Sequence, residues 1–458
     1  MNFFYLALYT YSLFSLSQGG IFDLVNVFPG DLTKLTYEKL YNATATRSLY
    51  EYLDLDVDPY DNFYLFSCGN IFFVFIYLPS EFEEGKYDDD SRIIHTLHKL
   101  REKCKTLPED EIFGCNSEIF NFGTYALSSL FIRKNKIKSE KNGNYNRVKD
   151  MVERIKEEFR LLIDEKKNIL DEETKNNFLH KLDSMKFVRS VDIYELFAVE
   201  LMEECYEGMG IDFRANITSI IKSMKDYRVL SEIRKDGLDS CDGLISQSGK
   251  HLHFYVYSNA FYDAIGNFFS ISSDALNEPS FSRDFPNSLN YGHLGYIVAH
   301  EILHAFESDN YKSILEGGNK SKFNVTKIDC FVKQYGTQKE SLTSKNINGL
   351  LTLGEIFADN GGLKIAHRAY MKYLQNNGGN DLVVPGFESL TNEQLFFISA
   401  ARSQCVYTSK YYLETVADRS KHIPALIRTN IALSNYKPFS NAFKCELNSK
   451  MNPEDKCG

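Results

Sequence analysis

Two histidines and a glutamate lie close together in the 458-residue chain, in the pattern H-E-x-x-H. His300 and His304 are four residues apart, so a helix would place both imidazoles on one face, where they could bind one zinc ion. Glu301 is then placed to take a proton from a water bound to that ion. An exposed helix with a charged face is the alternative. The apolar residues around the motif disfavour it, because they would bury the helix.

A third zinc ligand is predicted about fifty residues further along the chain. Glu355 and Asp359 are four residues apart in a segment rich in Ala and Gly. Glu355 could bind the zinc, and Asp359 could contact a ligating histidine and fix its tautomer. Glu307, three residues after His304, could do the same. The pair E-x-x-x-D is common in helices, but after H-E-x-x-H it indicates a three-ligand site with an open position for water.

The composition indicates a globular chain rather than a disordered one, with 43% hydrophobic and 25% charged residues. Its length allows two or three domains. The net charge is -10, and no large basic patch is evident in the sequence. Nucleic acid is therefore not expected as a partner.

The first 22 residues carry no charge and contain an apolar run, which predicts a signal peptide over residues 1–19 and a secreted protein. The alternative is an uncleaved anchor that holds the catalytic domain outside the cell, with membrane attachment only through the N-terminus. Nine cysteines and four N-glycosylation sequons fit an extracellular, disulfide-bonded glycoprotein. The sequons begin at Asn42, Asn216, Asn319 and Asn324.

The expected fold is mainly α with a small β-sheet. Helices are predicted over 93–104, 147–168, 171–186, 192–208 and 213–235, as a scaffold. The basic segment 134–147 is predicted to be a solvated turn, and residues between Cys104 and Cys115 a loop. Residues 251–257 and 267–272 alternate in polarity around a turn at Gly266, which predicts two strands ahead of the zinc helix.

From Pro279 to the C-terminus the sequence resembles the neprilysin family of zinc endopeptidases, which includes the endothelin-converting enzymes. The resemblance rests on the zinc helix and on short motifs around it. It extends to Asn259-Ala260-Phe261-Tyr262, which is similar to the family's substrate-binding strand. The other matching segments are 57–69, 287–292, 348–349, 352–355, 358–363, 451–453 and 456–457.

This resemblance implies a gluzincin-type catalytic domain with one Zn²⁺ per chain. It implies His300, His304 and Glu355 as zinc ligands, Glu301 as the general base and Asp359 as the acid that orients a ligand. The activity implied is that of a secreted endopeptidase that cuts peptides or proteins before hydrophobic residues.

The resemblance also implies residues that contact the substrate. Asn259 and Ala260 match residues that hold the peptide backbone at a strand edge. His422 matches a histidine that stabilises the oxyanion, and Arg428 matches an arginine that grips a substrate carbonyl. The family has an acid two residues before that histidine, whereas this chain has Ser420. A catalytically weak or inactive peptide-binding protein on the same fold is therefore the alternative function.

The largest departure from the family is the length between Cys104 and Cys115. The matching cysteines of the family are paired and enclose a large helical lid domain, whereas ten residues separate them here. An alternative is that the sequence omits a lid domain present in the natural protein. The uninterrupted run from Cys104 to Cys115 argues against this alternative. The resemblance implies the pairs Cys104–Cys115, Cys68–Cys405 and Cys330–Cys457, and two of Cys205, Cys241 and Cys445 are expected to pair.

Four regions are expected on this basis. Residues 1–19 form the leader, 20–104 the first part of the catalytic domain, 105–250 a helical linker or reduced second domain, and 251–458 the catalytic zinc-peptidase domain. Without a full lid the cleft should be open enough to admit larger or folded substrates.

Overall fold

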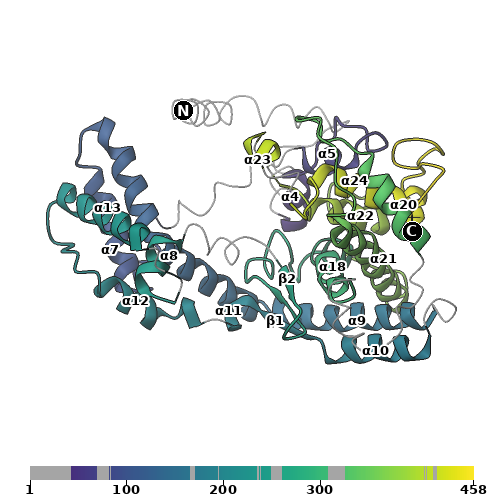
Figure 1. Ribbon diagram of the computed structural model, residues 1–458, viewed down its shortest axis with the longest axis horizontal. Coiled ribbons are helices and arrows are strands. Elements are labelled where there is room, and N and C mark those ends of the chain that lie inside the picture. The colour runs from purple at the N-terminus through teal and green to yellow at the C-terminus, as the bar shows by residue number, and fades with distance from the viewer. Residues whose placement is uncertain are drawn as a thin grey trace.

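Figure 1 shows the computed structural model, which describes residues 43–69, 82, 84–165, 171–193, 195–234, 237, 239–248, 260–307, 325–406, 408, 410–415 and 420–457. Over these residues the fold is mainly helical with one small sheet, which confirms the predicted fold class. Among the helices described, none has both the length and the apolar composition needed to cross a bilayer. The predicted leader, the predicted strand 251–257 and Asn259 lie outside the described residues.

The helices that carry or support the candidate site pack around a large apolar core. The main ones are α9 (Asn144–Glu165), α18 (Tyr296–His304), α21 (Leu353–Asn376) and α22 (Asn392–Arg402). On α9, buried Val148, Met151, Ile155 and Phe159 recur every three or four residues, so one face of the helix is apolar and packs on the core. The other helical elements of this part of the chain are α4 (Thr44–Tyr50), α5 (Phe63–Cys68), α10 (Glu172–Ser184), α17 (Asn287–Asn290), η3 (Tyr291–Gly295), α20 (Val325–Gly336), α23 (Lys410–Thr415), α24 (Ala425–Asn435) and α25 (Lys437–Ala442).

Helices α18 and α21 pack closely because α21 has a glycine where they meet. A Cβ on Gly362 would lie 2.9 Å from the backbone nitrogen of His300 and 3.0 Å from its Cα. Only glycine allows the two backbones to approach this far. Gly362, Asp359 and Glu355 are spaced three and four residues apart, so they share one face of α21. The close packing therefore holds both acids against α18.

The sheet has three short strands, β1 (Lys186–Arg189), β2 (Ala260–Asp263) and β3 (Phe268–Ile271). Their order is β1-β3-β2, with β1 parallel to β3 and β2 antiparallel to it. Strand β3 lies within the predicted strand 267–272. Strand β1 was not predicted, since residue 186 was expected to end a helix. Strand β2 is an edge of the described sheet.

A second apolar core gathers α7 (Arg92–Cys104), α8 (Glu109–Lys141), α12 (Val199–Glu207), α13 (Ile217–Arg234) and α14 (Cys241–Ser246). Figure 1 shows these helices at the left end of the molecule, away from α18 and α21. The long helix α8 runs from this group toward the sheet and α9. It thereby joins the second core to the first.

The basic segment 134–147 is not the solvated turn that the sequence predicts. Helix α8 continues to Lys141, and α9 begins at Asn144, after Gly143 with its φ of 72°. The Lys134 ammonium lies 3.2 Å from Asp90, and that of Lys136 lies 2.9 Å from Asp192. At least these two lysines of the helix are thus paired with acids from other elements, which a local reading of polarity misses.

Three other boundaries differ from the prediction. The helix expected over 192–208 is broken into α11 (Ser190–Ile193), η2 (Glu195–Phe197) and α12, because Ala198 is extended. The helix expected from 213 begins at Ile217, since the side chain of Asn216 accepts a hydrogen bond from the backbone nitrogen of Ser219. The loop after Cys104 ends at Pro108, and Cys115 lies within α8, whose first turn carries three acids.

Four disulfides tie the described elements together. Three are the pairs that the family resemblance implies, Cys68–Cys405, Cys104–Cys115 and Cys330–Cys457. The fourth joins Cys205 to Cys241, and Cys445 is a buried free thiol. Cys68–Cys405 links α5 to the chain just after α22, and Cys330–Cys457 fixes the C-terminal segment to α20.

Candidate metal centre and active site

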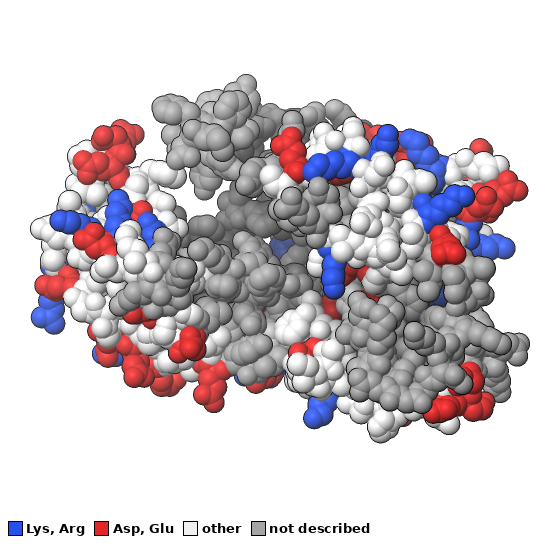
Figure 2. Space-filling model, in the orientation of Figure 1, with Lys and Arg blue, Asp and Glu red and all other residues white. Residues whose placement is uncertain are grey.

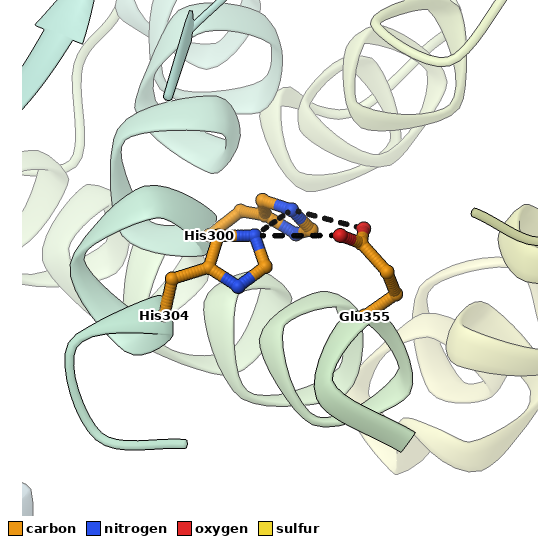
Figure 3. A group of neighbouring side chains, drawn as sticks. All are labelled: His300, His304 and Glu355. Atoms are coloured by element: carbon orange, nitrogen blue, oxygen red, sulfur yellow. Dashed lines mark hydrogen bonds and ion pairs between the residues drawn. The ribbon is translucent and has the colours of Figure 1, made fainter. Parts of the chain in front are cut away.

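Figure 3 shows the imidazoles of His300 and His304 and the carboxylate of Glu355 pointing toward one another. The histidines come from α18 and the glutamate from α21. The two Nε2 atoms are 2.9 Å apart, and the Glu355 oxygens lie 3.5 Å from Nε2 of His300 and 3.7 Å from Nε2 of His304. One ligand atom from each residue lies within 4.8 Å of the other two. The structure thus brings together the three predicted ligands.

A carboxylate faces the other ring nitrogen of each histidine. Nδ1 of His304 is hydrogen-bonded to Glu307, and Nδ1 of His300 lies 3.0 Å from Oδ1 of Asp359. An imidazole that directs its Nδ1 proton at a carboxylate presents the lone pair of Nε2. The two Nε2 atoms lie 2.9 Å apart, so a metal ion that takes the place of any proton between them would bind both lone pairs. The donor set of two imidazoles and one carboxylate therefore fits a zinc ion.

Two acids of the site, Glu355 and Asp359, have pKa values below the ordinary value of their carboxyl groups. Burial would raise the pKa of Glu355, but His300 and Arg428 outweigh burial and bring this pKa to about 2. Burial likewise opposes ionisation of Asp359, which is fully inaccessible to solvent, yet Arg428 and His300 hold its pKa well below the ordinary value. The resulting negative charge favours a divalent cation at this point.

Glu301 is buried beside the ligands and lines the same cavity as they do. Burial raises the pKa of its carboxyl, and the neighbouring His300 and His304 offset part of that rise. A carboxylate whose pKa moves toward neutrality is better matched to accept a proton and pass it on. The structure thus gives this residue the surroundings expected of a general base.

Arg428, on α24, is bound to two acids of α21. Its Nε donates to Oδ2 of Asp359 at 2.8 Å, and its Nη2 donates to Oδ1 of Asp359 at 2.6 Å and to Oε2 of Glu355 at 3.2 Å. Within the described part of the chain, Nη1 has no hydrogen-bond acceptor. Arg428 lines the cavity, so Nη1 remains as a donor for a bound molecule.

His422 lies at the cavity with its side chain largely exposed. Its Nε2 is 3.4 Å from Oε1 of Glu355. Ser420 accepts a hydrogen bond from the backbone nitrogen of His422 at 3.0 Å. The serine therefore holds the backbone of this loop, where the family pattern has an acid.

The three predicted ligands, Glu301, His422 and Arg428 all line one cavity of about 370 Å³. Its wall includes Ala260 of β2, the predicted backbone-binding residue, whereas its partner in that prediction, Asn259, lies outside the described residues. Because β2 is an edge of the described sheet, its backbone can pair with an extended peptide. The full lining is Ala260, Phe261, Tyr262, Ile297, His300, Glu301, His304, Glu355, Ser403, Gln404, His422 and Arg428.

Reasoning from the sequence missed three residues around this site. Tyr296 donates a hydrogen bond to Asp359, and its position four residues before His300 was the available signal. Ser403 and Gln404 line the cavity next to Cys405, and no local pattern singles them out.

Comparison with known proteins supports the family resemblance. Residues 259–458 match the model of peptidase family M13. Neprilysin-1 of Caenorhabditis elegans is 31% identical over 350 residues, which are 73% of this chain and 44% of that protein. Human neprilysin is 39% identical over 209 residues, which are 43% of this chain and 27% of that protein. The chain thus spans less than half the length of these relatives.

Solved structures agree on the fold. A Mycobacterium tuberculosis zinc metalloprotease, crystallised with an inhibitor, is similar over 77% of this chain and 51% of its own, with a TM-score of 0.50 and 18% identity. A Haemonchus galactose-containing glycoprotein complex is similar over 76% of this chain and 55% of its own, with a TM-score of 0.53 and 20% identity. Residues 259–458, which carry the zinc helix and the acids of α21, thus match peptidase family M13, and the two solved structures share the fold of this chain.

Proposed function

We propose that this protein is a zinc-dependent endopeptidase that acts outside the cell. The observation that carries the proposal is the convergence of His300, His304 and Glu355, with a carboxylate facing Nδ1 of each histidine and Glu301 buried beside them. The M13 match and the neprilysin relatives support the same activity.

One zinc ion would be held by the two Nε2 atoms and the Glu355 carboxylate. When bound, zinc supplies a Lewis acid that polarises a carbonyl and makes water more acidic. Glu301 accepts the proton of the attacking water and delivers it to the leaving amine. Asp359 and Glu307 keep the two imidazoles in the tautomer that binds metal.

The substrate is proposed to be a peptide in extended form. Its backbone pairs with β2 at Ala260 and, by extension, at Asn259. Nη1 of Arg428 donates to a substrate carbonyl, and His422 donates to the oxygen that becomes negative as the bond is attacked. Phe261 and Ile297 line the cavity and support cleavage before a hydrophobic residue.

Extracellular location is supported by the four disulfides among the described residues. Asn216 is exposed at the start of α13 and is proposed to carry a glycan. Attachment of the chain to a membrane through its N-terminus remains the alternative to secretion. A cleft without a full-length lid is proposed to admit larger substrates, for which cleavage of intact casein beside short peptides is the test.

The test of the activity is metal removal. The purified protein is expected to contain one zinc per chain and to cleave a quenched peptide with a hydrophobic residue after the scissile bond. Chelation should abolish cleavage, and one equivalent of zinc should restore it. Absence of bound zinc and of metal-dependent cleavage would refute the proposal, whereas zinc without cleavage would favour the non-catalytic peptide-binding alternative.

A further inference from the structure

Tyr296 and His300 contact the same oxygen of Asp359. Tyr296 lies one turn before His300 on α18 and is only 5% exposed. Its hydroxyl donates a hydrogen bond of 3.0 Å to Oδ1 of Asp359. Nδ1 of His300 lies 3.0 Å from that same oxygen. The hydroxyl and the imidazole, both from α18, therefore meet at one atom of α21.

The bond from Tyr296 differs from those of Arg428. The guanidinium of Arg428 contacts both oxygens of Asp359 and also Glu355, so it can follow a movement of either acid. Tyr296 is buried in the protein and belongs to α18, the helix that carries both histidines. Its hydroxyl therefore ties the rotation of the Asp359 carboxylate to α18 itself.

We propose that Tyr296 is a positioning residue of the metal centre, whose hydroxyl holds Asp359 in the orientation that directs Nε2 of His300 at the zinc. The inference rests on the proposed zinc function. Without the hydroxyl, the Asp359 carboxylate keeps its bonds to Arg428 but loses its hydrogen bond to α18, the helix that carries His300. The His300 ring is then less well oriented, and zinc should bind more weakly.

The test is the zinc affinity of Y296F, measured by competition with a chromophoric chelator. Loss of such an outer partner is expected to weaken zinc binding about tenfold. Y370F is the matched control, because Tyr370 is also buried and its hydroxyl donates a hydrogen bond of 3.0 Å to Asp381, away from the site. Y370F should bind zinc as the parent protein does.

The double variant Y296F/D359N shows whether the hydroxyl acts through Asp359. The double variant is expected to bind zinc no more weakly than D359N alone, because the two residues form one unit. Unchanged zinc affinity in Y296F, or losses that simply add, would overturn the inference. Circular dichroism checks the fold, and Y296M replaces Y296F if the latter does not fold. A parent protein that binds no zinc would instead overturn the proposed function itself.

A second, independent observation concerns the cavity wall next to the Cys68–Cys405 disulfide. Gln404 lines the cavity, and its side-chain amide has no hydrogen-bond partner among the described residues. Its backbone is well fixed, since its nitrogen donates to Ala401 at 3.0 Å and the next residue is in the disulfide. The neighbouring Ser403 hydroxyl donates to Ala400 at 2.7 Å. The free amide thus sits on a rigid wall.

We infer that Gln404 selects substrates with a hydrogen-bonding side chain at one position near the scissile bond. An amide offers both a donor and an acceptor, so side chains such as Gln or Asn suit it better than Leu. This inference rests on the proposed peptidase activity. The substrate would then carry a polar side chain at one position near the scissile bond, in addition to the hydrophobic residue proposed directly after that bond.

The test compares quenched peptides that keep the hydrophobic residue after the cut and carry either Gln or Leu at each of the neighbouring positions. At one position the parent protein is expected to favour Gln by about three- to tenfold in kcat/KM, as one hydrogen bond provides. Q404L should reverse this preference, and Q375L, at an exposed residue of α21, should not. Identical preferences in the parent and Q404L at every position would overturn the inference. If no peptide is cleaved at all, the proposed function fails with it.

Discussion

Arg428 and Asp359 form a two-point ion pair in the interior, next to the proposed metal ligands. Nε and Nη2 of the arginine lie 2.8 Å and 2.6 Å from the two oxygens of the aspartate. The residues are 69 positions apart in sequence and belong to α24 and α21. This pair connects α24 to the acid proposed to orient His300, so the proposed metal centre depends on both α24 and α21.

Replacing this arginine should damage the fold as well as the site. R428A leaves the buried carboxylate of Asp359 without its cation, which is expected to cost about 3–5 kcal/mol of unfolding free energy. R428K keeps the charge but loses the planar fork, so a smaller loss and weaker zinc binding are expected. The free energy is measured by urea denaturation.

The control for R428K is R368K, because Arg368 is itself a residue of α21. Arg368 makes two hydrogen bonds to Glu165 at the surface, at 3.1 and 2.7 Å, and one of 3.4 Å to the buried Glu158, which also has Lys372 as a partner at 2.8 Å. Losing the surface bonds to Glu165 in R368K should lower the unfolding free energy by less than about 1 kcal/mol. Equal effects of R428K and R368K on zinc binding would contradict the role assigned to Arg428.

The glycine at the contact of α18 and α21 should not tolerate a methyl group. In G362A the new Cβ would lie 2.9 Å from the His300 backbone nitrogen, so the helices must separate. We expect lower thermal stability and loss of zinc. G114A is the matched control, since a Cβ there meets no atom within 4 Å and Gly114 lies in helix α8. That change should stabilise the protein by up to about 1 kcal/mol. A G362A protein that melts and binds zinc normally would refute the close-packing argument.

The exposed His422 should affect the rate of turnover but not the binding of zinc. H422A is expected to lower kcat by about a hundredfold or more, as for the loss of an oxyanion donor, with zinc content unchanged. S420D supplies an acid two residues before the histidine and should raise kcat. Loss of zinc in H422A would show instead that its ring, 3.4 Å from Glu355, supports the metal site.

Asp274 should make stability depend on pH. Burial raises the pKa of this carboxyl from 3.8 to about 7, and Lys138 offsets part of the rise. The folded state holds the Asp274 proton more tightly than the unfolded state does. The contribution of this group to the unfolding free energy is therefore fully present below about pH 4 and is lost as the pH rises through 7. D274N should therefore gain up to about 4 kcal/mol over the parent protein above pH 7, and nothing near pH 4.

The exposed Asp226 provides the control for this pH dependence. D226N should follow the parent protein at each pH in urea denaturation. If D274N also follows it throughout, the burial of Asp274 does not affect folding.

The three residues proposed as zinc ligands could be singled out from the sequence because much of their geometry is local. His300 and His304 are one helical turn apart, and Glu355 and Asp359 are one turn apart on a second helix, so each pair shares a face without reference to the fold. The sequence also predicted the helical class and strand β3. These features follow from periodicity in short windows.

The remaining features depend on contacts between distant segments. Lys134 and Lys136 of α8 pair with Asp90 and Asp192, and neither acid lies in the helix. The bonds of Arg428 to Asp359 arise only when α24 packs on α21. Gln404 reaches the cavity because the Cys68–Cys405 disulfide fixes the end of α22 beside α5. A local pattern contains none of this information.

The central claim is that Glu301 transfers the proton in a reaction that needs the zinc site. The measurement is zinc content and peptide cleavage of the parent protein and of E301Q, side by side. We predict one zinc per chain in both and a loss of kcat of at least about a thousandfold in E301Q, since the amide cannot accept the proton. Equal rates in the two proteins would contradict the account.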